Sequence, residues 1–133
     1  MNSLMDMSSP TFKMRFMYMA GYDDESKFDA FKKKFTLAPY AGKIKCPVLI
    51  QAGEDDELSP VEFSDALLAK IKPPKKFVVY EGERHAIGGN NPSSYLGENW
   101  FTMLADWCLD RVEGRRAPNE RVFINALGQA TSK

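Results

Sequence analysis

The chain has 133 residues, enough for one modest domain with a hydrophobic core and too few for an elaborate multidomain enzyme. Its 18 basic and 18 acidic side chains cancel, which argues against a nucleic-acid partner. The sequence shows no signal-peptide pattern, and no segment has the apolar length of a membrane span. We therefore expect a soluble, cytoplasmic protein with no membrane partner.

The N-terminal region, residues 10–36, predicts a helical lead-in. Residues 10–20 are rich in Phe, Met and Tyr and end at Gly21, which is typical of a short helix with a glycine terminator. An acidic run then favours the start of a second helix, on which Phe28, Phe31 and Phe35 recur at helical spacing. Residues 37–45 form a connector.

Residues 46–113 read as a β-α-β-α series. The apolar runs 47–52 and 77–80 predict strands buried on both faces. Between them, the pattern from Ser59 to Glu62 resembles a capping box that opens a helix. That helix directs four apolar side chains toward a core: Phe63, Leu67, Leu68 and Ile71. Strand, helix, strand in this order predicts a parallel pair with a right-handed crossover.

A long final helix is expected to start at Ser93 or Ser94 and to end before Gly114. Its inner stripe and edge consist of Tyr95, Leu96, Trp100, Met103, Leu104, Trp107 and Arg111. The tail, residues 115–133, is polar apart from 122–127, which we expect to dock as a small appendage. Cys46 at the first strand and Cys108 on the last helix are predicted to be buried, unpaired thiols in a reducing compartment.

This pattern predicts an α/β fold built on a two-stranded parallel sheet, with the whole chain, residues 1–133, forming one partial domain. A sheet of two parallel strands has two open edges and is incomplete alone. We therefore expect either the last portion of a larger sheet or a chain that completes its sheet by pairing with another.

Asp56 and His85 are the candidate catalytic residues. Each lies in a loop that follows one of the two predicted strands, and such loops gather at one end of a parallel sheet. A carboxylate that accepts a hydrogen bond from one imidazole nitrogen fixes the tautomer, so the other nitrogen can take a proton from a nucleophile.

Two other interpretations of the acidic loop stay open. Its carboxylates favour the N-terminus of the following helix, and Asp55, Asp56 and Glu57 could together hold a divalent metal. No phosphate-binding glycine loop accompanies them, so we expect no metal and no cofactor. The chain also contains no G-x-S-x-G. Ser59, Ser93 and Ser94 are assigned to helix starts, and neither cysteine is well placed, so a nucleophile is missing.

At these residues the chain resembles the C-terminal part of the α/β-hydrolase superfamily. The acid loop there typically reads G-x-x-D-x-x-(V)-P, which Gly53, Asp56 and Pro60 match, and the histidine loop reads G-x-x-H, as Gly82 to His85 does. In this alignment the aspartate of the acid-loop pattern falls on Asp56 and not on Asp55. The segments 44–47 and 105–107 are most similar to the branch of 2,6-dihydroxypseudooxynicotine hydrolase, dienelactone hydrolase and prolyl-oligopeptidase-like enzymes. The resemblance covers residues 10–118.

The resemblance implies the end of a serine hydrolase that cleaves ester, amide or activated C–C bonds. In that superfamily the triad residues follow the chain order serine, acid, histidine. The resemblance therefore implies that the serine elbow, the oxyanion loop and the first strands lie upstream of Met1. The chain alone would then be inactive and would act on a small-molecule substrate only when completed. The alternative is a non-catalytic α/β module that self-associates, or pairs with another chain, through an open sheet edge.

Overall fold

The computed structural model describes residues 10–34, 36–88, 94–95 and 98–132. The chain divides into two compact units, Met1–Pro39 and Tyr40–Lys133, each of which is described by itself. Within the described ranges, no helix combines the length and the apolar character that crossing a membrane requires.

The first unit contains two helices at the predicted places, α2 (Pro10–Met19) and α3 (Glu25–Lys32). Gly21 follows α2 with a φ of 73°, the left-handed conformation expected of a glycine terminator. Asp24 caps α3, because its Oδ1 accepts a hydrogen bond from the Lys27 N–H at 3.0 Å. The Ser26 hydroxyl and then that backbone N–H lower the pKa of Asp24 by stabilising its carboxylate.

A small aromatic cluster holds this unit together. Phe28 is buried, and the rings of Tyr22 and Phe31 lie 6.0 Å and 6.3 Å from it. Two of the three predicted phenylalanines therefore meet as their helical spacing suggested. The third, Phe35, lies outside the described residues.

The second unit is built on one four-stranded sheet with the order β1-β2-β5-β6. Its strands are β1 (Val48–Gly53), β2 (Lys75–Tyr80), β5 (Glu120–Ile124) and β6 (Ala130–Ser132). The first three are parallel and β6 runs antiparallel to β5. The two predicted strands thus exist and pair in parallel, with Val48 opposite Lys75.

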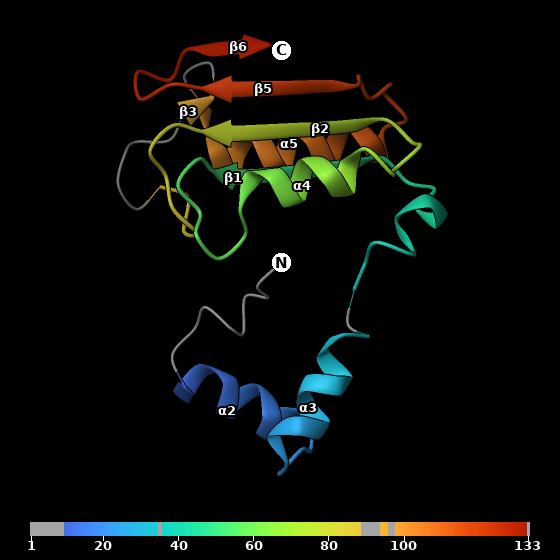
Figure 1. Cartoon of the computed structure of the whole chain (residues 1–133). Coiled ribbons are helices and arrows are strands. Elements are labelled where there is room, and N and C mark those ends of the chain that lie inside the picture. Colours follow the sequence, from blue (N-terminus) through green and yellow to red (C-terminus); the bar gives the residue numbers. More distant parts are fainter. Residues whose placement is uncertain (1–9, 35, 89–93, 96–97, 133) are drawn as a thin grey trace. The chain divides into compact units, whose positions relative to one another are not determined.

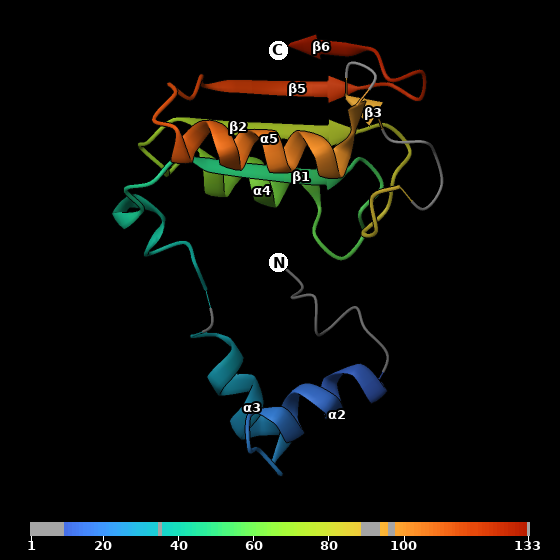
Figure 2. The same cartoon turned by 180° about the vertical axis from the view of Figure 1, so that it is seen from behind.

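Helices cover both faces of the sheet. A 3-10 turn (Ala41–Lys43) precedes β1, α4 (Val61–Leu68) follows it, and α5 (Trp100–Val112) follows the short hairpin of β3 (Ser94–Tyr95) and β4 (Glu98–Asn99). Figure 1 shows α4 in front of the sheet, and Figure 2, seen from behind, shows α5 in front of it. The alternation along β2 explains this arrangement, since Phe77 and Val79 pack in the α4 core and Val78 and Tyr80 in the α5 core.

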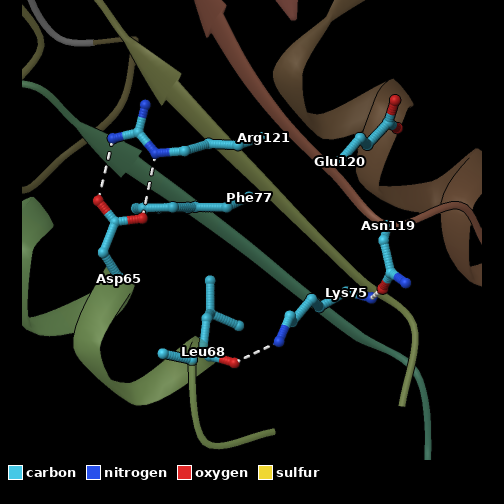
Figure 3. Close-up of a pocket in the computed structure, with 8 residues that line it drawn as sticks. Asp65, Leu68, Lys75, Phe77, Asn119, Glu120 and Arg121 are labelled. Carbon is cyan, nitrogen blue, oxygen red and sulfur yellow. Dashed lines mark hydrogen bonds and ion pairs between the residues drawn. The ribbon is translucent and has the colours of Figure 1, made fainter. Parts of the chain in front are cut away.

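Residues 120–124 overturn the prediction of a two-stranded sheet. β5 takes in the end of the predicted polar tail and the start of the predicted appendage 122–127, lies between β2 and β6, and buries Val122 and Ile124 to 1% exposure. The first two residues of β5, Glu120 and Arg121, are charged, and each forms an ion pair with a residue of opposite charge. Lys76 pairs with Glu120 at 2.7 Å, and Figure 3 shows Arg121 reaching across Phe77 to the Asp65 carboxylate, 3.1 Å away.

Replacing Val122 with alanine is expected to lower the free energy of unfolding by about 2 kcal/mol, because it empties space at the centre of the sheet. Urea denaturation measures the change. Leu127 supplies the control, since it lies beyond β5 and is 81% exposed, so that Leu127→Ala should change stability by less than about 0.5 kcal/mol. Equal effects for the two variants would contradict the central position of β5.

Three predictions about helix starts and faces are wrong. Pro60 is the N-cap residue of α4 and makes no side-chain cap, so Ser59 closes no capping box. The last helix begins at Trp100, where Asn99 Oδ1 accepts the Phe101 N–H at 2.8 Å. Ser94 and Tyr95 belong to β3 instead, while Ser93 and Leu96 lie outside the described residues.

Burial also differs from the predictions at three side chains. Phe63 is 44% exposed on α4 rather than turned into the core. Cys46 and Cys108 are both free, as expected, but both are exposed. Cys46 precedes β1 instead of opening it, and Cys108 lies on the side of α5 away from Met103, the residue of that helix that is buried. The predicted inner stripe otherwise holds, with Trp100, Leu104, Trp107 and Arg111 half-buried.

Candidate functional site

Asp56 and His85 meet at the carboxyl ends of β1 and β2. The Nδ1 atom of His85 lies 3.0 Å from Asp56 Oδ2 and 3.2 Å from Oδ1. The Asp56 side chain is 5% exposed, whereas the His85 side chain is 60% exposed. The carboxylate is therefore held inside the protein, and the imidazole turns part of its ring toward solvent.

The acid loop fixes the Asp56 carboxylate with its own backbone. Oδ1 accepts hydrogen bonds from the Leu58 and Ser59 N–H groups, each at 2.9 Å. This is the turn geometry that aspartate side chains favour where a strand gives way to a helix. Ser59, predicted to cap α4, serves this turn through its N–H. The adjacent Asp55 is exposed and contributes only its N–H, which binds the Glu83 carbonyl at 2.9 Å.

The two loops cross in close contact at Gly53. A Cβ built on Gly53 would lie 2.2 Å from the Glu83 carbonyl oxygen and 2.4 Å from that of Arg84. Beside this crossing the Glu54 N–H binds the Tyr80 carbonyl at 2.9 Å, and the Glu54 carboxylate accepts the Gly82 N–H at 3.2 Å. Several backbone hydrogen bonds thus set the distance between the acid loop and the histidine loop.

Glu83 is a structural residue of the site that the sequence did not reveal. Its side chain is 1% exposed and accepts the Gly88 N–H at 3.0 Å, which closes the loop that carries His85. A glutamate in a polar, glycine-rich loop gives no sequence signal that distinguishes a buried carboxylate from a solvated one. A carboxylate this deeply buried needs hydrogen-bond partners, so the folded state is stable only when the loop places the Gly88 N–H beside Glu83.

Replacing Glu83 with glutamine is expected to lower the free energy of unfolding by about 1.5 kcal/mol, because a charged acceptor for the Gly88 N–H is lost in a buried place. Urea denaturation measures the loss, and NMR of the single histidine reports whether the loop moves. The exposed Glu62 offers a matched control, Glu62→Gln, which should leave the His85 spectrum unchanged and alter stability by less than about 0.5 kcal/mol. An unchanged His85 spectrum and stability in Glu83→Gln would refute this role.

A hollow of about 490 Å³ lies beside His85 on the α5 side of the sheet. It is lined by Leu49, Gln51, His85, Ala86, Ile87, Trp100 and Leu104. Gln51 crosses its base, where Gln51 Oε1 accepts the Tyr80 hydroxyl at 2.7 Å. The hollow is therefore mostly apolar, with the imidazole at its border.

Other hollows offer less chemistry. One of about 300 Å³ lies toward the opposite end of the strands, and its cations are engaged (Figure 3). Arg121 binds Asp65, and Lys75 Nζ donates to the carbonyls of Leu68 and Ile71 at 2.6 Å and 2.8 Å. The acidic loop lines another hollow, yet the described residues contain no group of three His, Cys, Asp or Glu side chains placed to hold a metal ion.

The geometry defines what the pair can do. With Asp56 accepting from Nδ1–H, the Nε2 atom of His85 carries the lone pair and can take a proton, and the carboxylate stabilises the imidazolium that results. Among the described residues, no serine or cysteine side chain is hydrogen-bonded to His85. Comparisons with protein-family models, with curated proteins and with solved structures found no match.

Proposed function

We propose that this chain is the C-terminal segment of a serine hydrolase of the α/β-hydrolase type, and that Asp56 and His85 are the acid and the base of its triad. The observation that carries the proposal is the contact of 3.0 Å between His85 Nδ1 and an anchored, buried Asp56 carboxylate. The parallel order of β1 and β2, with the acid after the first strand and the histidine after the second, supports the same assignment.

The proposed reaction is hydrolysis of an ester, amide or activated C–C bond in a small molecule. His85 Nε2 takes the proton of a serine hydroxyl, and the serine oxygen attacks the substrate carbonyl. The imidazolium, held by Asp56, then gives its proton to the leaving group, and the same cycle activates a water that releases the acyl group. In this proposal the serine and the oxyanion donors belong to a segment that is not part of this sequence, so we expect this chain alone to be inactive.

A serine-directed fluorophosphonate probe tests the missing nucleophile. The intact chain should show no labelling above that of its heat-denatured control, because no serine is activated by His85. Stoichiometric labelling of one serine, abolished by His85→Ala, would instead place the nucleophile within this sequence. Labelling that persists in His85→Ala would show that His85 does not activate the labelled residue.

The two exposed, free thiols suit a reducing compartment, and we propose the cytoplasm as the location. Cys46 and Cys108 would otherwise be open to disulfide exchange and oxidation. Electrophoresis of alkylated protein taken directly from cells should find both thiols reduced.

The outer edge of β1 favours a second candidate function, a non-catalytic module that pairs with another chain. β1 is the first strand in the sheet order, and no described strand lies on its far side. An edge strand of this kind presents N–H and C=O groups to any strand that can align with it. Titration of the labelled chain with a candidate partner, followed by amide exchange along β1, tests this function.

A further inference from the structure

The outward-facing backbone groups of β1 can be assigned from its pairing with β2. The Val48 N–H binds the Pro74 carbonyl at 3.0 Å, and the Glu54 N–H binds the Tyr80 carbonyl at 2.9 Å. In a parallel ladder the residues that bond a neighbour alternate with residues that point away from it. Leu49, Gln51 and Gly53 therefore direct their N–H and C=O groups to the open edge. The Gly53 carbonyl also accepts the Asp56 N–H at 3.4 Å and keeps its second lone pair for a partner.

The side chains of β1 are only partly covered, although its sequence is almost wholly apolar. Residues 48–51 are half-buried, and only the last two residues of the strand are buried. Helices cover both faces of this sheet, but β1 is the first strand in the sheet order and has a described neighbouring strand only on its β2 side. The half-exposed side chains of β1 thus lack the cover that a second neighbouring strand would bring.

An apolar stripe on α5 borders the same edge. We call Phe101, Leu104, Cys108 and Val112 the α5 stripe, because steps of three, four and four residues place them on one side of the helix. Phe101 is 63% exposed and Val112 is 85% exposed. Leu104 lines the hollow together with Leu49 of β1, so the stripe begins on the β1 side of the sheet and continues outward around α5.

Charge at the two ends of β1 selects the direction of a partner strand. Lys43 and Lys45 precede the strand and are exposed, whereas Glu54, Asp55 and Glu57 follow it and are also exposed. A second copy aligned in parallel would place lysines beside lysines. An antiparallel copy places the lysines of each chain beside the acids of the other, and opposite charges across strands are stabilising.

We propose that β1 pairs with β1 of a second copy of this chain, antiparallel about a two-fold axis, so that the two four-stranded sheets become continuous. Antiparallel pairing is the arrangement in which one surface is complementary to itself. Opposing Gln51 to Gln51 of the second copy lets all three outward residues pair, since Leu49 then faces Gly53 of the second copy. The same two-fold axis brings the α5 stripes of both copies to one face of the joined sheet.

The proposal rests on the second candidate function and is independent of the Asp56–His85 centre. If the edge accepts a different chain instead, the protein alone stays monomeric, and this inference fails while that candidate function stands. Activation of a serine by His85 is tested by the fluorophosphonate probe whatever the association state.

Charge reversal gives a sharp test by sedimentation equilibrium, with the wild-type chain expected to form a dimer. Lys45→Glu and Glu57→Lys should each weaken dimerisation about tenfold or more, because like charges then meet at both ends of the paired strands. An equimolar mixture of the two variants should recover heterodimers, since the two introduced charges then meet each other at one end and the native Lys45 and Glu57 meet at the other. A monomeric wild-type chain, or a mixture no tighter than the separate variants, would overturn the proposal.

Two further measurements test the α5 stripe and the β1 edge separately. Phe101→Glu should also weaken the dimer at least tenfold, whereas Leu127→Glu, the same change at an exposed site beyond β5, should leave it unaltered. Amide exchange at Leu49, Gln51 and Gly53 should slow as protein concentration rises, while Ile50 and Ala52, already bonded to β2, stay unchanged. A dimer whose β1 amides exchange independently of concentration would show that the copies meet elsewhere.

Discussion

Replacing Gly53 with alanine is expected to lower the free energy of unfolding by about 4 kcal/mol, the largest stability loss we expect from a single methyl group in this chain. The new Cβ would lie 2.2 Å from the Glu83 carbonyl oxygen and 2.4 Å from that of Arg84. Both are backbone atoms, so neither can rotate away as a side chain could, and the Glu83 carbonyl also accepts the Asp55 N–H at 2.9 Å. The acid loop and the histidine loop must separate to admit the methyl group.

Gly42 offers a matched control for this prediction. A Cβ at Gly42 would lie 3.8 Å from its nearest neighbour, the Lys70 carbonyl oxygen, which is ordinary contact. Gly42→Ala should therefore change stability by less than about 1 kcal/mol. Urea denaturation compares the two variants, and NMR of the single histidine reports whether His85 still contacts Asp56. A Gly53→Ala protein of wild-type stability would mean that the two loops do not cross as tightly as this.

The strands next to the site could be predicted because their side chains carry a local signal. The runs that form β1 and β2 are continuous and apolar, and the loops after them bring Asp56 and His85 to one end of the sheet. The loop pattern also distinguished Asp56 from Asp55. Asp55 turns to solvent, and Asp56 is the acid in contact with His85.

The third parallel strand could not be predicted from its own residues. β5 begins with Glu120 and Arg121, which suggest a solvated segment when read locally. Their partners, Lys76 and Asp65, lie 44 and 56 residues away in the sequence, so only the tertiary fold neutralises them. Glu83 is hidden for a different reason: one of its partners, the Gly88 N–H, is a backbone group, which the sequence does not distinguish from any other.

The wrong helix start of α5 has a different cause. Serine is a good N-cap residue, and the sequence offers Ser93 and Ser94 close to an apolar run. Asn99 is an equally good cap, and it lies directly before Trp100, whose side chain borders the hollow beside His85. Local preference alone does not rank the serines above Asn99, and the half-buried position of Trp100 is a tertiary feature that local preference does not contain.

Replacing Asp56 with asparagine is expected to invert the tautomer of His85. The Leu58 and Ser59 N–H groups both donate to Oδ1, so the side-chain carbonyl of the asparagine should keep that place and its NH₂ group should take the place of Oδ2. An N–H donor then faces Nδ1, which must become the acceptor. The proton moves to Nε2. This is the nitrogen that would accept the proton of a nucleophile, so His85 can no longer act as a base there.

Long-range ¹H–¹⁵N spectra measure this change directly, because His85 is the chain's only histidine. At a pH where the imidazole is neutral, the wild type should be mainly Nδ1–H and Asp56→Asn mainly Nε2–H. The ratio of tautomers should change about tenfold or more, since a hydrogen bond to a charged acceptor is worth about 1.5–3 kcal/mol. Asp55→Asn removes the same charge one residue away and should leave the wild-type tautomer in place. If the wild type is mainly Nε2–H, then Asp56 does not orient His85 as a base, and the hydrolase assignment loses the contact on which it depends.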